Sequence, residues 1–234
     1  MTYTRSRALA AAAVLATAAG VGAVAAPAAD AAPTSAVTVA KLKPAQLKAA
    51  LLTQKDMPKG FKAAGSAAGT PGGGSLEGVT PLDACSKKWL DAETKARGVS
   101  GVAAATFVRS GGASTIVNGV SEFASLARAK GFLAAERTLA KQCPTVSWKV
   151  GENVTLTMKY SALSMARQGE ESLALSLVTT VKQSGQTVQA KGSTVLLRPG
   201  DVVSSITTTV FEGSVPAPAK LAAASSARVA KVLR

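Results

Sequence analysis

The sequence predicts an α+β fold, in which helices pack on an antiparallel sheet of about six strands and a single disulfide joins two of the helices. Two features of the hydrophobic pattern support this prediction. Before residue 144, several stretches repeat hydrophobic residues every three or four positions, as one face of a helix requires. After residue 144, hydrophobic and polar residues alternate, and the turn sequences Gln183-Ser184-Gly185 and Pro199-Gly200 separate the alternating runs.

The first 31 residues have the features of a signal peptide. Arg5 and Arg7 precede an uncharged, alanine-rich run over residues 8–26, and Ala29-Asp30-Ala31 provides small residues for cleavage after Ala31. A transmembrane anchor is the alternative, but alanine and glycine gain little free energy from entering lipid. We therefore expect residues 1–31 to be removed. The mature protein is expected to be secreted, extracellular or cell-wall associated, with no stable membrane insertion.

The mature chain is long enough for one domain with its own hydrophobic core. We expect residues 32–44 to be a flexible N-terminal segment and residues 45–234 to form the domain. Within it, residues 65–78 contain six glycines and almost no charge, which predicts a mobile loop. A phosphate-binding loop is the alternative, but the stretch lacks the spacing of both common glycine-rich phosphate motifs.

Each helix and strand is predicted from a local pattern. Leu47, Ala50 and Leu51 share one face of a short helix after Pro44, which ends before Met57-Pro58 because the residue before proline avoids helical geometry. Longer helices are expected at residues 81–95, 125–142 and 219–233. Strands are expected at residues 102–108, 115–123, 154–160, 172–182, 187–197 and 202–211, the last three as an antiparallel meander.

The two cysteines are expected to form a disulfide. Cys85 and Cys143 both lie on apolar helical faces, and proteins exported from the cell usually meet an oxidising environment. A bridge across the long intervening segment would stabilise the fold by about 4 kcal/mol in the chain-entropy description. Two buried free thiols are the alternative.

The composition argues against most catalytic and metal sites. The chain has no histidine and only two cysteines, which excludes a Ser-His-Asp triad, a His-ligated metal and a four-thiolate metal site. Glu170-Glu171 is the only adjacent pair of carboxylates, and in a strand the two side chains would point to opposite faces. We expect no enzymatic activity, no metal and no cofactor. A hydrolase that works without histidine is the alternative.

Two tryptophans and one sequon are candidates for other roles. Trp89 lies on the same helical face as Cys85, so we interpret it as core packing around the disulfide in preference to ligand stacking. Trp148 lies at the start of a strand, and its role stays open. Asn153-Val154-Thr155 matches a glycosylation sequon, although such short matches are common by chance.

The positive charge is concentrated at the two ends of the mature chain. The whole sequence has a formal net charge of +14, and the mature chain would carry +13. Residues 41–62 contribute +5 and residues 220–234 contribute +4, which leaves a nearly balanced body. Aromatic residues are not interleaved with these cations, so nucleic acid is not an expected partner. Anionic wall polymers or lipid headgroups are the expected partners of such ends, and simple solubilisation is the alternative.

Several segments resemble a known family. The stretch Leu51 to Phe61, which reads LLTQKDMPKGF, is similar to the opening of secreted and lipid-anchored actinobacterial sensor-like domains. The type example of that family is the extracellular domain of the mycobacterial serine/threonine kinase H. Val120-Ser121-Glu122-Phe123 followed by residues 127–143 resembles the family's strand and its helix ending in a bridged cysteine. Gly200-Asp201-Val202-Val203 with a closing helix resembles its C-terminal hairpin and cover.

The resemblance implies an antiparallel sheet with helices that form a ligand-binding cleft, and it implies no catalytic residues. The family commonly has two disulfides, whereas this chain allows only one. The leading hypothesis is therefore a secreted, non-catalytic, sensor-like domain that binds an unknown small or wall-derived ligand. The alternative is a basic adhesion module that binds anionic cell-surface polymers or lipid headgroups.

Overall fold

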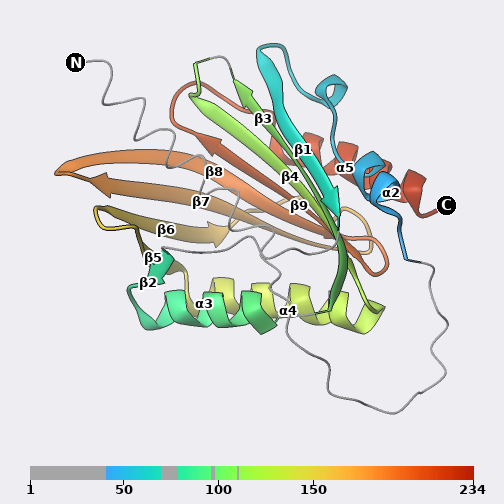
Figure 1. The fold of residues 1–234 in the computed structure, drawn as a ribbon, viewed down its shortest axis with the longest axis horizontal. Helices are drawn as coiled ribbons and strands as arrows, with labels where there is room; N and C mark the ends of the chain where they lie inside the picture. Colours follow the sequence, from blue (N-terminus) through green and yellow to red (C-terminus); the bar gives the residue numbers. More distant parts are fainter. Residues whose placement is uncertain (1–40, 70–78, 96–97, 110) are drawn as a thin grey trace.

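A computed structural model describes residues 41–69, 79–95, 98–109 and 111–234. Within these residues, nine strands form one antiparallel sheet in the order β1-β3-β4-β9-β8-β7-β6-β5-β2 (Figure 1). The strands are β1 (Phe61–Gly69), β2 (Val79–Pro81), β3 (Val99–Arg109), β4 (Ser114–Phe123), β5 (Thr145–Val150), β6 (Val154–Ala162), β7 (Glu171–Gln183), β8 (Gln186–Arg198) and β9 (Val202–Val210). The predicted signal peptide and residues 32–40 lie outside the described residues.

The α+β class is confirmed, but the prediction of about six strands was wrong, because the sheet has nine. Strand β1 was missed because it lies at the edge of the sheet with most of its residues exposed, so its Ala- and Gly-rich sequence shows no alternation. Strands β2 and β5 are short and pair with each other at the opposite edge. The loop predicted at residues 65–78 starts later, since residues 65–69 continue β1, and residues 70–78 lie outside the described residues.

The helices cover both faces of the sheet. They are α2 (Pro44–Ala49), the short 3-10 helix η1 (Gln54–Asp56), α3 (Ala84–Lys95), α4 (Leu126–Gln142) and α5 (Pro218–Val232). Figure 1 shows α3 and α4 side by side on one face, while α2 and α5 lie on the other. Helix α3 begins three residues later than predicted, because Pro81 still belongs to β2.

The face under α2 and α5, called here the α2/α5 face, is filled by the largest apolar cluster. Its fully buried side chains include Leu47 and Leu51 from the N-terminal segment, Leu221 from α5, and Phe107, Ile116, Val195, Leu197 and Ile206 from the sheet. Chain segments from both ends of the described domain therefore meet in one core.

A buried polar network fixes this layer. The Leu52 N–H donates to Asn118 Oδ1 at 2.7 Å, and Asn118 Nδ2 donates to the Ser205 carbonyl at 2.9 Å and to Ser204 Oγ at 3.1 Å. Ser204 Oγ in turn shares a hydrogen bond of 2.7 Å with Ser225 Oγ of α5. Asn118, Ser204 and Ser225 are 0% exposed, so the network joins three elements where water cannot replace a lost partner.

The LLTQKD stretch has a structural role at the same place. The N–H and hydroxyl of Thr53 donate to Asp56 Oδ2 at 2.7 and 2.9 Å, which closes the turn of η1. Arg228 of α5 donates from Nε to the same Asp56 oxygen at 2.8 Å and from its guanidinium to Thr53 Oγ at 2.7 Å. Burial raises the pKa of Asp56, but these hydrogen bonds outweigh it and leave the pKa below its ordinary value. The motif thus anchors the N-terminal segment to the C-terminal helix.

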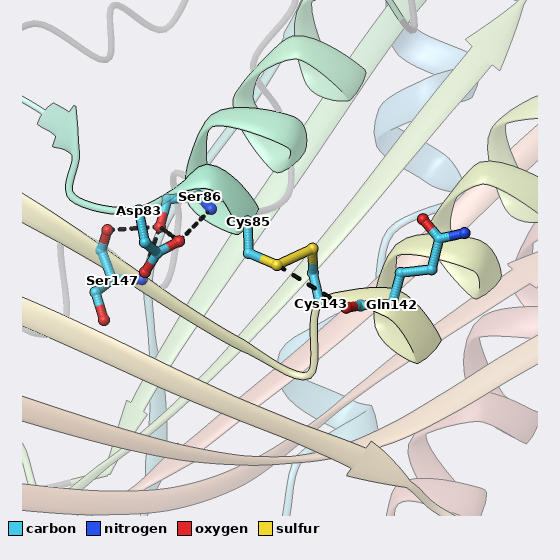
Figure 2. The surroundings of a disulfide bond; sticks show 6 residues. All are labelled: Asp83, Cys85, Ser86, Gln142, Cys143 and Ser147. Carbon is cyan, nitrogen blue, oxygen red and sulfur yellow. Dashed lines mark hydrogen bonds between the residues drawn. A yellow bond between two sulfur atoms is a disulfide. The ribbon is translucent and has the colours of Figure 1, made fainter.

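The other helix pair is joined by the predicted disulfide, which is confirmed. Cys85 lies in the first turn of α3 and Cys143 caps the end of α4, with their Cα atoms 5.3 Å apart. Beside the bridge, Ser86 Oγ donates to Asp83 Oδ1 at 2.7 Å, and the Ser147 N–H donates to Ser86 Oγ at 2.8 Å (Figure 2). Helix α3 is therefore held covalently to α4 and by hydrogen bonds to β5.

The disulfide should contribute strongly to stability. Its cysteines are 58 residues apart, so its loss should lower the free energy of unfolding by up to about 4 kcal/mol because the unfolded chain gains freedom. Chemical denaturation of the double variant Cys85→Ser with Cys143→Ser would measure this. Unfolding midpoints that match those of the oxidised wild type would contradict a stabilising role for the bridge.

Candidate functional site

The adjacent glutamates are part of a structural ion-pair cluster. Glu171 starts β7 and binds Arg198 Nε at 2.9 Å and Arg137 Nη1 at 2.6 Å, while Glu170 binds Arg198 Nη1 at 3.0 Å. The opposite orientation expected for two neighbouring strand residues does not arise, because Glu170 lies before the strand, next to Gly169 with φ +66°. Hydrogen bonds from Arg198 hold the pKa of Glu171 below its ordinary value, so this carboxyl is unsuited to general acid catalysis.

The tryptophans lie in the core under α3 and α4. Trp89 is 8% exposed and stacks on Tyr160 with ring centroids 5.1 Å apart, which confirms its packing role next to Cys143. However, its indole Nε1 is buried and has no acceptor among the described residues. Trp148 lies in β5 at the margin of the same cluster, and Asn153 is exposed just before β6. Trp89 therefore combines core packing with an unused hydrogen-bond donor.

Helix α4 presents one interrupted apolar stripe to the sheet. Its buried residues are Ala129, Leu133, Glu136 and Leu139, which recur every three or four positions. Leu133 packs with Phe123, Leu196 and Val203, and Leu139 packs with the Trp89 cluster. On this stripe Glu136 lies between Leu133 and Leu139. These two leucines belong to separate apolar clusters, and Leu173 contacts both clusters.

Glu136 is the unusual group of this layer. It is 6% exposed, and no hydrogen bond or ion pair to it occurs among the described residues. Glu122, the other buried glutamate, shows the contrast: it accepts hydrogen bonds from the Leu42 N–H at 2.8 Å and from Ser100 Oγ at 2.9 Å. Burial of an acid is ordinarily compensated in this way. The carboxyl of Glu136 has no such compensating hydrogen bond or ion pair among the described residues.

Burial raises the pKa of Glu136 from its ordinary value of 4.5 to about 7. No charged neighbour contributes to this shift, since desolvation is its single cause. A carboxyl that titrates near neutral pH inside a protein is a common property of binding and catalytic sites. Glu136 is therefore the strongest candidate for a functional side chain in the described part of the chain.

The sheet face under α3 and α4, called here the α3/α4 face, is rich in hydroxyl groups. The cross-strand pairs Thr194–Thr207 and Thr115–Thr209 share this face with Leu196 and Val203, because side chains two residues apart point the same way. Thr115, Thr207 and Thr209 are only 4%, 7% and 5% exposed. The face thus continues from an apolar core under the helices into a shielded, hydroxyl-lined area.

This arrangement suits the binding of a small, partly apolar molecule. Leucine side chains flank Glu136, and threonine hydroxyls on the sheet can donate or accept hydrogen bonds. Among the described residues, no three His, Cys, Asp or Glu side chains gather closely enough to hold a metal ion. None of the helices in that part of the chain has the length and hydropathy to span a bilayer.

Comparison with known proteins identifies the fold. The structure is similar to the extracellular domain of PknH from Mycobacterium tuberculosis, with a TM-score of 0.57 and 12% sequence identity over 82% of this chain and 96% of that one. It also matches the Rv0999 ortholog from Mycobacterium smegmatis, with a TM-score of 0.41 and 13% identity over 79% of this chain and 94% of that one. No family model and no curated protein matches the sequence. The resemblance inferred from the LLTQKDMPKGF stretch is thereby confirmed at the level of the fold.

Replacing Glu136 should change how stability depends on pH. Between pH 4.5 and about 7 the folded protein retains a proton that the unfolded chain has released, so the free energy of unfolding should fall as the pH rises through this window. Glu136→Gln should remove that loss, and at pH 8 it should be more stable than the wild type by roughly 3 kcal/mol. Urea denaturation at pH 4, 6 and 8 measures the effect.

Glu152→Gln is the matched control, because it makes the same chemical change at an exposed turn. If the stability of Glu136→Gln and the wild type differed equally at all three pH values, the buried, partner-free state of Glu136 would be contradicted.

Proposed function

We propose that the protein is an exported, non-catalytic, sensor-like domain that binds a small ligand between helices α3 and α4 and the hydroxyl-rich part of the α3/α4 face. The observation that carries this proposal is Glu136, a residue only 6% exposed whose carboxyl has no partner among the described residues, on the stripe that α4 packs against the sheet. Natural folds rarely keep such a destabilising group unless a function requires it.

Two further observations support the proposal. The shared fold with an extracellular domain fits a binding role outside the cell, although a fold alone does not define a function. The disulfide fits an oxidising compartment, and the signal-peptide features of residues 1–31 fit export. The Arg198 cluster offers no carboxyl free to act as an acid or base.

A ligand screen tests this function directly. Compounds with apolar and wall-derived structures should raise the melting temperature, since a ligand at one hundred times its dissociation constant adds about 2.7 kcal/mol to the free energy of unfolding. Backbone NMR shifts caused by the hits should map to α4 and to the α3/α4 face of β8 and β9. Shifts confined to α2 and α5, or a broad screen without any hit, would contradict the proposal.

A second candidate function is adhesion to anionic cell-surface polymers. The structure brings the two basic ends of the chain together, because α2 packs against α5 and Asp56 pairs with Arg228 at 2.8 Å. Within residues 41–62 and 220–234, Asp56 is the only acidic residue, and Arg228 forms an ion pair with it. The following exposed cations of these segments are called here the basic side: Lys41, Lys43, Lys48, Lys55, Lys59, Lys220, Lys231 and Arg234.

Sedimentation with purified cell wall separates the two functions. If the basic side binds wall polymers, the bound fraction should fall severalfold between low and high salt, because salt screens exposed charges. Lys48→Glu with Lys231→Glu should weaken binding much more than the matched control Lys182→Glu with Lys191→Glu, which changes exposed lysines on β7 and β8. Equal loss in both double variants would show only a net-charge effect and contradict a specific basic side.

A further inference from the structure

The chemistry around Glu136 also indicates what kind of ligand would be bound. This inference rests on the proposed ligand-binding function and concerns the same site. The carboxyl lies at the meeting point of two leucine-rich clusters, and within the described residues the protein supplies it with no hydrogen-bond donor and no cation.

Three cations on the neighbouring elements are already engaged, and Lys88, Lys130 and Lys141 are exposed to solvent. Arg137, the next residue of α4, donates to Glu171 and to the Ser172 carbonyl. Arg198 of β8 is bound by Glu170 and Glu171 and donates to the Gly200 carbonyl. On α3, Lys87 pairs with Asp91 in solvent. A ligand cation could therefore bind Glu136 while each of these side chains keeps its present partner.

The charged side chains that the sheet adds to this face are already paired, because Glu171 of β7 and Arg198 of β8 bind each other at 2.9 Å. Strand β9 contributes Val203, Ser205, Thr207 and Thr209 to the α3/α4 face, and Glu122 of β4 points to the opposite face, where Leu42 and Ser100 bind it. An incoming positive charge would therefore meet one unpaired carboxyl in apolar surroundings. In such surroundings an ion pair with hydrogen bonds is much stronger than in water.

We propose that this site takes a ligand with a protonated amine joined to an apolar body, with the ammonium group bound by Glu136 and the apolar body packed beside Leu139 and Leu173. An ammonium offers three hydrogen-bond donors, which the unpartnered carboxylate can accept. An anionic ligand would be repelled by the carboxylate, and a neutral one would leave its charge uncompensated.

The test uses n-octylamine, n-octanol and octanoate, each below its micellar concentration, in titration calorimetry at pH 8 with the oxidised mature protein. Octylamine should bind at least about tenfold more tightly than octanol, as a charge-assisted hydrogen bond predicts, and octanoate should bind most weakly. Glu136→Gln should bind octylamine and octanol equally, whereas the control Glu152→Gln should keep the preference for the amine.

The outcomes separate this inference from the proposed function. Equal affinity of the wild type for all three compounds would overturn the amine preference and leave a ligand site that selects only apolar bodies. An amine preference that persists in Glu136→Gln would place the amine elsewhere and also overturn the inference. No binding of any compound would overturn it as well, and the ligand screen with NMR mapping would then decide the proposed function independently.

Discussion

The central strands of this protein are buried on both faces, and most of the remaining structure follows from that constraint. Strands β4, β8 and β9 need a cover on each side, and the chain supplies two helix pairs that are fastened by different chemistry. On the α2/α5 face, Asn118 joins the N-terminal segment to Ser204 and, through it, to α5. On the α3/α4 face, a disulfide holds the helix ends together. Both covers depend on contacts between residues far apart in the sequence.

The two covers differ in how completely they satisfy their polar groups. Glu122, near α2, has its carboxylate bound by two donors, and Asn118 uses both ends of its amide. Under α3 and α4, by contrast, the Trp89 indole Nε1 is buried without a partner, and Glu136, a residue only 6% exposed, has no hydrogen bond or ion pair to its carboxyl in the described part of the chain. Unused polar groups in a buried layer lower stability, and a bound molecule that supplies their partners would recover that loss. This asymmetry is the physical basis for placing the site on the α3/α4 face.

Local patterns in the sequence predicted the elements that have one buried face. The extent of α4 and the β7-β8-β9 meander were predicted within a few residues because their periodicity is strong. Strand β1 was missed because an exposed edge strand needs no hydrophobic alternation, and the bounds of β5 were not predicted, beyond a strand start at Trp148, because six residues give too little pattern. The cysteine pair was predicted from export and helical position. Glu136 was missed because an isolated glutamate in a helix usually faces solvent, although its spacing from Leu133 and Leu139 places it on the buried stripe. Its lack of a partner depends on tertiary packing, which no local pattern contains.

The central claim is that Glu136 is a buried carboxyl that lacks a partner and titrates near neutral pH. Carbon-13 NMR of the glutamate side-chain carboxyl, assigned with Glu136→Gln and followed from pH 3 to pH 9, measures this directly in the ligand-free protein. The structure predicts a midpoint at about 7 for Glu136. A midpoint near the ordinary value of 4.5 would show that water or a protein donor reaches the carboxylate, and it would contradict the assignment of this residue as the centre of a ligand site.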